Sequence, residues 1–286
     1  MRKAFDDLTI ADDYMFCTVM QDKSICTAVL NMVLSQSIGA ITDITYQKTF
    51  NQLGNAKGIR LDVLVKDDRG SVYDVEMQTT NQQDLAKRLR YYQAVLDVSS
   101  LEKGGHYTDL PHSFILFFCP FDYLNRDLPI YTFKTICSED TAITLPNGVT
   151  QVLINSAAAH KAAEPELKSF LNYMNGIVSD SPLIRKIDEY IKALKENEER
   201  RKNYMLLQAF EMDARHYGRQ QGIQQGIQQG IQQGIQQGKS LGLVEGEIRG
   251  SRQKALETAR ILKQLGDSIT KIVQATGLTK EEIEKL

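Results

Sequence analysis

The chain has 286 residues, of which 42% are hydrophobic and 24% charged, so it can form one globular domain with a sizeable core and an extension. A net charge of −2 and an isoelectric point near 6.1 exclude a global positive field that would attract the whole chain to a polyanion. Any binding of nucleic acid must therefore rest on a local basic surface.

Neither the N-terminal segment nor the most hydrophobic run of the chain indicates a membrane protein. The first residues, MRKAFDDLTIADD, contain no apolar segment of the kind found in a secretory signal. The most hydrophobic run, FILFFC at 114–119, is far too short to span a bilayer. We therefore expect a cytoplasmic protein with no membrane partner.

The four cysteines show no metal-binding or redox spacing. None belongs to a C-x-x-C motif, and all have apolar neighbours, which favours small buried thiols over zinc ligands or disulfides. This composition is typical of a reducing compartment. The residues are Cys17, Cys26, Cys119 and Cys137.

The N-terminal half alternates between helical and strand periodicity. Apolar residues at three- and four-residue steps predict one or two helices over 10–35, and alternation predicts a strand over 41–50. The sequence NQLGNAKG at 51–58 predicts a loop, and two further strands are expected on either side of the DDRG turn at 67–70.

The pattern then predicts a helix over 81–101, with Asn81 as its N-cap. SFILFFC at 113–119 has the uniform hydrophobicity of a strand buried on both faces, and strands are also expected at 131–137 and 150–156. This order predicts an α/β (α+β) fold with a central mixed β-sheet flanked by helices, ending near residue 165.

The remainder is predicted to be helical. Residues 166–218 form a helical segment that includes a long charged helix over 183–217, and 219–238 repeat GIQQ with a glycine at every fourth position. Because glycine weakens a helix by roughly 1 kcal/mol relative to alanine, a tether or marginal helix is favoured there over a self-associating helix. Residues 239–286 predict a small helical tail.

That tail has the rhythm of a helix-turn-helix unit. SITKIVQATGLTKEEIEKL at 268–286 places a glycine-containing turn between two short helices. The second helix carries Glu281, Glu282 and Glu284, which would repel phosphates. A role in packing or assembly is therefore favoured over DNA reading.

The predicted hairpin at 59–78, IRLDVLVKDDRGSVYDVEMQ, contains candidate site residues. A three-residue loop at 68–70 with Gly70 in the left-handed conformation pairs residues whose numbers sum to 138, which places Asp62 opposite Glu76. Asp74, Glu76 and Gln78 then share one polar row. The opposite, apolar face is expected to consist of Ile59, Leu61, Val63 and Val65 against Val75 and Met77.

Opposed carboxylates about 4.5–5.5 Å apart at Cβ repel one another unless a cation or a proton lies between them. Mg²⁺ takes oxygen ligands from one or two carboxylates together with water and phosphate, and this pair supplies the carboxylates. Ordinary surface acids on a solvated hairpin face would give the same spacing. From the spacing alone, both interpretations remain open.

Several motifs in this order resemble a known family. The chain reads Arg60-Leu61-Asp62, a glycine turn, YDVEMQ at 73–78, KRLRYY at 87–92 and KGGHYTDLP at 103–111 before the hydrophobic strand. With Asp13, Tyr14 and Phe16 in the first helix, residues 8–160 resemble the PD-(D/E)XK nuclease-family transposases, the recombination-promoting nuclease group.

The resemblance implies a restriction-endonuclease-like core over residues 1–165 that cuts DNA with Mg²⁺, or with Mn²⁺ in its place. Asp62 and Glu76 correspond to the metal-binding acids of the family. Gln78 stands where the superfamily carries a lysine. An amide can position water but supplies no charge, so more of the catalysis would fall on the metal.

Three further side chains complete the predicted catalytic set. Arg60, opposite Gln78 in the register, either replaces the charge of the lysine or forms a surface ion pair with Asp62 or Asp74. Arg88 and Tyr92 lie four residues apart on one helix face and either serve the site or act as a surface cation and a core aromatic. Asp13 is the weakest candidate, because an acid is common in a first helical turn.

Two functions are consistent with these residues. The first is a Mg²⁺-dependent DNA endonuclease, active in recombination or transposition, that works as a homodimer or higher homo-oligomer. The second is a catalytically inactive DNA-binding or oligomeric assembly protein on a nuclease fold, which Gln78 and the acidic overall charge favour.

Overall fold

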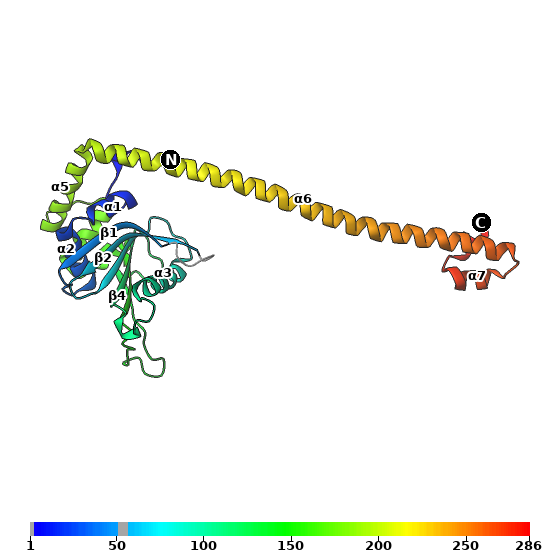
Figure 1. The fold of residues 1–286 in the computed structure, drawn as a ribbon, viewed down its shortest axis with the longest axis horizontal. Helices are drawn as coiled ribbons and strands as arrows, with labels where there is room; N and C mark the ends of the chain where they lie inside the picture. Colours follow the sequence, from blue (N-terminus) through cyan, green and yellow to red (C-terminus); the bar gives the residue numbers. More distant parts are fainter. Residues whose placement is uncertain (1–2, 51–56) are drawn as a thin grey trace. The chain divides into compact units, whose positions relative to one another are not determined.

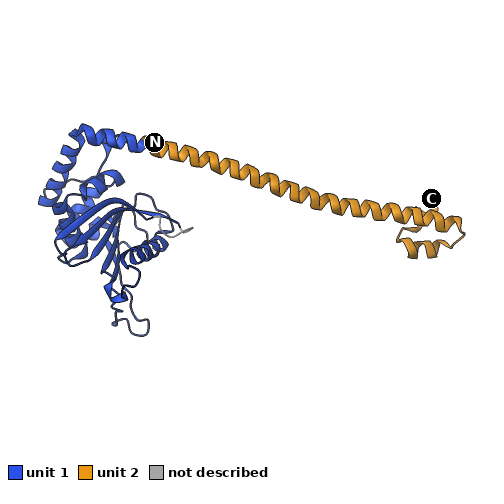
Figure 2. Ribbon diagram, viewed as in Figure 1, with its two compact units in different colours: residues 1–208 blue, residues 209–286 orange. Residues whose placement is uncertain are grey.

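The computed structural model describes residues 3–50 and 57–286 (Figure 1). The chain divides into two compact units, residues 1–208 and 209–286 (Figure 2), and each is described by itself. The loop predicted at 51–58 lies outside the described residues except for its last two positions.

A six-stranded mixed sheet forms the centre of the first unit (Figure 1). Its spatial order is β1-β2-β3-β4-β6-β5, with β3, β4 and β6 parallel to one another and the other neighbours antiparallel. The strands are β1 (Ile41–Phe50), β2 (Ile59–Asp67), β3 (Val72–Met77), β4 (Ser113–Cys119), β5 (Ile130–Phe133) and β6 (Val149–Asn155). The predicted mixed sheet is confirmed, with the FILFFC strand β4 at its centre.

Helices cover both faces of this sheet. One apolar cluster joins one face to α1 (Asp13–Val19), α2 (Lys23–Leu34), α4 (Pro165–Met174) and α5 (Pro182–Glu196). A second cluster joins the opposite face to α3 (Leu85–Ser100). Short 3-10 helices are η1 (Phe5–Asp7), η2 (Tyr107–Asp109) and η3 (Ser156–Lys161). The helical segment after residue 165 therefore packs on the sheet.

Two predicted helix boundaries were wrong. The helix expected from Asn81 begins at Leu85, with Asp84 at its N-cap; the preceding Gln82 N–H donates to the Thr80 carbonyl at 3.0 Å, which is not a helical bond. The long charged helix expected over 183–217 is interrupted at Asn197, whose side chain accepts from the Arg200 N–H at 3.0 Å and starts a new helix, α6 (Glu198–Gln264).

Two smaller predictions also need correction. The strand expected over 131–137 ends at Phe133, and only an isolated bridge joins Ile136 to Thr144 within the described residues. Cys17, Cys26 and Cys119 are buried as predicted, but Cys137 is only half-buried, and its thiol donates to Glu139 at 3.1 Å. Cys137 differs because the strand has already ended.

The hairpin turn has the predicted geometry. Gly70 has φ 81°, and the residue pairs from Val63–Val75 to Lys66–Val72 all sum to 138. The buried Asp67 carboxylate organises the turn by accepting from the N–H groups of Arg69 and Ser71 at 3.0 and 2.8 Å and from the Tyr73 hydroxyl at 2.9 Å. It also accepts from the N–H of Gly39, before β1, at 3.0 Å.

The predicted single apolar face of β2 was wrong. Val63 and Val65 pack in the cluster with α1 and α2, whereas Ile59 and Leu61 pack in the cluster under α3. The change of face occurs at Asp62. This position falls between the β1–β2 pairs Tyr46–Val63 and Lys48–Leu61, and Gln47, between Tyr46 and Lys48, has φ 49°. The side-chain alternation of β2 is therefore interrupted at a candidate metal ligand.

The second unit consists of the remainder of α6 with α7 (Ile269–Thr276) and α8 (Lys280–Glu284). The GIQQ repeat is helical and lies within α6. The expected helix-turn-helix rhythm ends in a five-residue α8 with Thr279 as its N-cap. The Glu282 carboxylate accepts from the Thr279 N–H at 2.9 Å and pairs with Arg252 of α6 at 2.7 Å. Among the described helices, none combines the length and the hydropathy that crossing a bilayer requires.

Replacement of Asp67 by alanine should lower the free energy of unfolding by about 2–3 kcal/mol, because a buried hydrogen bond to a charged group contributes about 1.5–3 kcal/mol. Tyr73→Phe, which removes one of the four donors, should cost less. Urea denaturation measures both. An unchanged midpoint for Asp67→Ala would contradict the role assigned to this carboxylate.

The same carboxylate predicts a pH dependence. Burial alone would raise the pKa of Asp67, but the hydrogen bonds from Tyr73, Ser71, Gly39 and Arg69 lower it below its ordinary value. A lowered folded-state pKa stabilises the fold above the unfolded pKa of about 3.9 and loses that contribution as the pH falls. The stability difference between wild type and Asp67→Ala should therefore shrink below about pH 4.

Alanine at Gly222, Gly226, Gly230 and Gly234 should stabilise α6 by about 0.5–1 kcal/mol per position, because a Cβ added at each meets no atom within 4 Å. Circular dichroism during thermal melting measures the change. Gln224→Ala, Gln228→Ala and Gln232→Ala form the matched control and should change little. Reduced helicity in the glycine variants would show that these glycines contact a partner.

Candidate active site

Three acidic side chains converge where β2 and β3 separate. The Asp62 N–H donates to Glu76 Oε1 at 2.7 Å, and the Met77 N–H donates to Asp62 Oδ2 at 3.1 Å. Each carboxylate thus takes the place of a backbone carbonyl beyond the last ladder pair, Val63–Val75. This reciprocal exchange holds the predicted pair, Asp62 and Glu76, side by side.

Asp74 is the third acid, and it is fully buried. Within the described part of the chain, no donor reaches either of its oxygens, although its carboxyl and that of Glu76 are placed to share a proton. Asp74 lies opposite Leu64 and faces the cluster under α3. The row of alternating polar residues on β3 is therefore covered by a helix rather than by water.

Burial raises the pKa of all three carboxyls. It raises the pKa of Asp62 to about 6, against the hydrogen bond from Met77, and that of Asp74 to about 8. Burial and the neighbouring charges of Asp74 and Asp62 raise the pKa of Glu76 well above its ordinary value. The charged forms of Asp74 and Glu76 are therefore disfavoured most, and a bound metal ion would favour those charged forms.

Arg88 of α3 is the cation paired with Glu76. Its guanidinium lies 3.9 Å from Glu76 Oε2 and donates to the Tyr92 hydroxyl at 3.1 Å. It also stacks on the rings of Tyr92 and Phe117, 5.3 and 5.2 Å from their centroids. One helical turn of α3 thus brings both residues of the predicted Arg88–Tyr92 pair to the carboxyls.

Gln78, at the position of the superfamily's lysine, is buried just beyond the end of β3. Its amide Oε1 accepts from Arg88 Nη1, and its Nε2 donates to the Thr80 carbonyl at 2.6 Å. The amide therefore orients the guanidinium, and the positive charge beside the acids comes from the neighbouring helix.

The two remaining predicted residues lie at the edge of this cluster. Arg60 is exposed and lies opposite Thr49 in the β1–β2 register. Its charge partly offsets the rise that burial causes in the pKa of Asp62. Asp13, at the start of α1, is near enough for its charge to raise that pKa. All six predicted site residues and Asp13 thus lie in one region of the first unit.

Sequence reasoning missed two contributors. Asp74 is expected in the polar row with Glu76 and Gln78 and as an ion-pair partner for Arg60, but it is not among the predicted site residues, although its alternation with Glu76 is the signal that could have identified it. Phe117 of β4 supplies the second aromatic face under Arg88, and that contact depends on the parallel pairing of β3 with β4.

The donor set suits a hard divalent ion. The buried carboxyl of Asp74 and the adjacent carboxylates of Asp62 and Glu76 are the ligand type that Mg²⁺ takes. In residues 3–50 and 57–286, no three His, Cys, Asp or Glu side chains are placed to hold a metal by themselves. An ion here would need waters or phosphate oxygens to complete its coordination.

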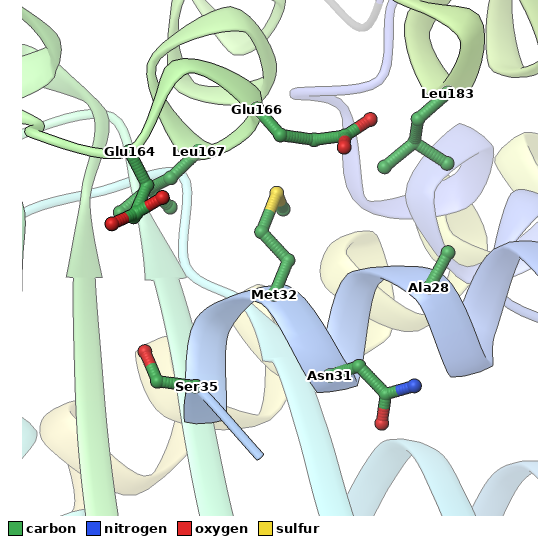
Figure 3. Close-up of a pocket in the computed structure, with 8 residues that line it drawn as sticks. All are labelled: Ala28, Asn31, Met32, Ser35, Glu164, Glu166, Leu167 and Leu183. Atoms are coloured by element: carbon green, nitrogen blue, oxygen red, sulfur yellow. The ribbon is translucent and has the colours of Figure 1, made fainter. Parts of the chain in front are cut away.

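A pocket of about 540 Å³ on the opposite helical layer has different chemistry. Met32 of α2 lies between Glu164 and Leu167 on one side and Glu166 and Leu183 on the other (Figure 3). Its described lining includes two glutamates and no cation, so it does not suit a phosphate ligand.

Residues 12–220 match the model of the PD-(D/E)XK nuclease family transposases. The chain belongs to this family. The mixed sheet flanked by helices is accordingly a restriction-endonuclease-like fold, and the match extends beyond the resemblance noted over residues 8–160 into α6. Neither the curated proteins nor the solved structures gave a match.

Membership of the PD-(D/E)XK nuclease family supports a nuclease or transposase-like function. Enzymes of this family generally use divalent metals, and a nuclease family implies DNA as the substrate.

Asp74→Asn should raise the free energy of unfolding in metal-free buffer by about 1–3 kcal/mol, the cost of a buried polar group without a partner. The amide removes one acid from the cluster and can donate to Glu76. Urea denaturation in EDTA measures the effect. Asp43→Asn on the exposed side of β1 is the control and should stay within about 0.5 kcal/mol of wild type.

Proposed function

We propose that this chain is a Mg²⁺-dependent DNA endonuclease that hydrolyses phosphodiester bonds through Asp62, Glu76 and Gln78. The observation that supports it best is the reciprocal hydrogen bonding that holds Asp62 and Glu76 together, at 2.7 and 3.1 Å, beside Arg88. A solvated hairpin face would not bury Glu76 or place a guanidinium against it.

Asp62 and Glu76 would hold the metal, with Mn²⁺ able to replace Mg²⁺, and the buried oxygens of Asp74 lie next to them. A bound ion polarises the phosphoryl oxygen and lowers the pKa of its water. Adjacent carboxylates repel one another as anions, and the charges of Asp74 and Asp62 raise the pKa of Glu76; a divalent cation bound between them would relieve that repulsion.

Arg88 is positioned to neutralise charge that develops on the phosphate. Gln78 and Tyr92 bind two of its nitrogens, so the guanidinium is oriented before substrate arrives. Phe117 and Tyr92 exclude water from its face. In this proposal the function of the superfamily's lysine is divided between Arg88, which carries the charge, and Gln78, which orients it.

A second candidate is a DNA-binding or assembly protein on the same fold that does not cut. It is favoured by the amide of Gln78, whose oxygen and nitrogen both have protein partners and are thus not free to position water. It predicts retention of DNA without product at any Mg²⁺ or Mn²⁺ concentration.

Supercoiled plasmid incubated with Mg²⁺ should be nicked or linearised by the wild type, and Asp62→Asn and Glu76→Gln should each lose at least about 100-fold of the rate, as expected for loss of a metal ligand. Asp62→Ala and Glu76→Ala should behave alike. Glu102→Gln, an exposed acid after α3, should cut normally. Equal cutting by wild type and Asp62→Asn would reject the proposal and reveal a contaminant.

Mg²⁺ should raise the midpoint of thermal unfolding of the wild type, because a ligand that binds only the folded state stabilises it. The shift should be absent in the Asp62→Asn/Glu76→Gln double variant. Differential scanning fluorimetry with Mg²⁺ and with Ca²⁺ measures it independently of cleavage. Identical shifts in wild type and double variant would place the ion elsewhere.

We also propose that the protein acts in DNA recombination as a homodimer or higher homo-oligomer in the cytoplasm. Concerted cutting of two strands needs two sites of the kind described. Sedimentation equilibrium of the full chain and of a chain ending at residue 218 should show a multimer for the former. A monomeric full chain would remove this part of the proposal.

A further inference from the structure

A pocket of about 460 Å³ opens beside the acids, between the first residues of β2 and the first turns of α3. Its cations include Lys57 and Arg60 before and in β2, and Lys87, Arg88 and Arg90 in α3, whereas Asp84 is the acid among its described lining residues. In a chain whose net charge is −2, this is a strong local concentration of positive charge. We call it the basic pocket.

The basic pocket adjoins the candidate active site. Arg88 and Tyr92 belong to both, and the Arg88 guanidinium lies 3.9 Å from Glu76 Oε2. A ligand that fills the basic pocket would therefore extend directly to the carboxyls.

The wall of the basic pocket is fixed by Tyr91. Its hydroxyl donates to the Lys57 carbonyl at 2.6 Å, which ties the segment before β2 to α3. Its ring is only partly covered by the core cluster and lines the pocket. An aromatic wall thus stands among four cations that are exposed, Lys57, Arg60, Lys87 and Arg90.

This combination suits a nucleotide. Cations bind phosphate, and an aromatic ring offers a surface on which a base can stack. The volume falls within the range of small-molecule pockets, which accommodates one nucleotide but not a base-paired duplex. The acidic pocket of Figure 3 lacks both features.

We infer that the basic pocket binds an unpaired nucleotide of the DNA strand, next to the phosphate that is to be cut. The inference rests on the proposed function for the position of the cut, and it goes beyond that function by assigning single-stranded or locally unpaired DNA as the preferred substrate. Lys87 and Arg90 bind the flanking phosphate, and Tyr91 stacks on the base.

Binding is measured by fluorescence anisotropy in EDTA, so that cleavage cannot occur. The probes are a 12-nucleotide oligothymidine and a blunt hairpin duplex, each with fluorescein at an equivalent position. The wild type should bind the oligothymidine at least about 10-fold more tightly than the duplex.

The variants separate charge from stacking. Lys87→Ala/Arg90→Ala should weaken oligothymidine binding by about 10-fold or more and lower the salt dependence, because two phosphate contacts are lost. Tyr91→Ala should weaken it by about 10-fold, and Tyr91→Phe, which keeps the ring, by much less. Lys48→Ala/Lys66→Ala removes two exposed cations outside the basic pocket and should bind as wild type does.

Equal affinity of Lys87→Ala/Arg90→Ala and the Lys48→Ala/Lys66→Ala control would overturn the inference, as would equal or tighter binding of the duplex by the wild type. Normal circular dichroism of each variant excludes loss of the fold. A wild type that binds as expected but never cuts plasmid with Mg²⁺ would contradict the proposed function and leave the basic pocket in place. Plasmid cleavage by the wild type that is unchanged in Lys87→Ala/Arg90→Ala and Tyr91→Ala would instead leave the proposed function in place and contradict the role of the basic pocket.

Discussion

The burial of Asp74 and Glu76, next to the half-buried Asp62 and the guanidinium of Arg88, is the constraint on which the rest of the site depends. Asp62, Asp74 and Glu76 lie where β2 and β3 separate, and Arg88 is the cation placed against them. Burial of like charges is costly unless protons or a cation compensate them. The fold accepts this cost beside a surface pocket that carries positive charge, which is the arrangement that phosphate chemistry needs.

The surrounding structure explains how the acids are held. Asp67 organises the turn that sets the hairpin register, and that register brings Asp62 to Glu76. The parallel pairing of β3 with β4 brings Phe117 beneath Arg88, and the first turns of α3 carry Arg88 and Tyr92 to the same place. The acids therefore depend on a turn, a sheet and a helix that are all parts of one layered unit.

Much of this arrangement could be predicted from local sequence. Gly70 and the alternation on either side of it predict the turn and the register, and the Arg88–Tyr92 spacing predicts a shared helix face. The burial of Asp74 could not be predicted, because an alternating polar strand has the same pattern whether water or a helix covers it. The change of face of β2 at Asp62 was also hidden, since the alternation within β2 gives no sign of it; it falls between the pairs Tyr46–Val63 and Lys48–Leu61, where Gln47 of β1 has a left-handed backbone.

The most direct test of the account is the position of the metal. Crystals of the full chain soaked with Mn²⁺, at a concentration that supports cleavage, would give an anomalous difference map. The account predicts a peak about 2.0–2.3 Å from carboxylate oxygens of both Asp62 and Glu76. A peak bound elsewhere, or no peak at these acids, would contradict the claim that they form a metal site.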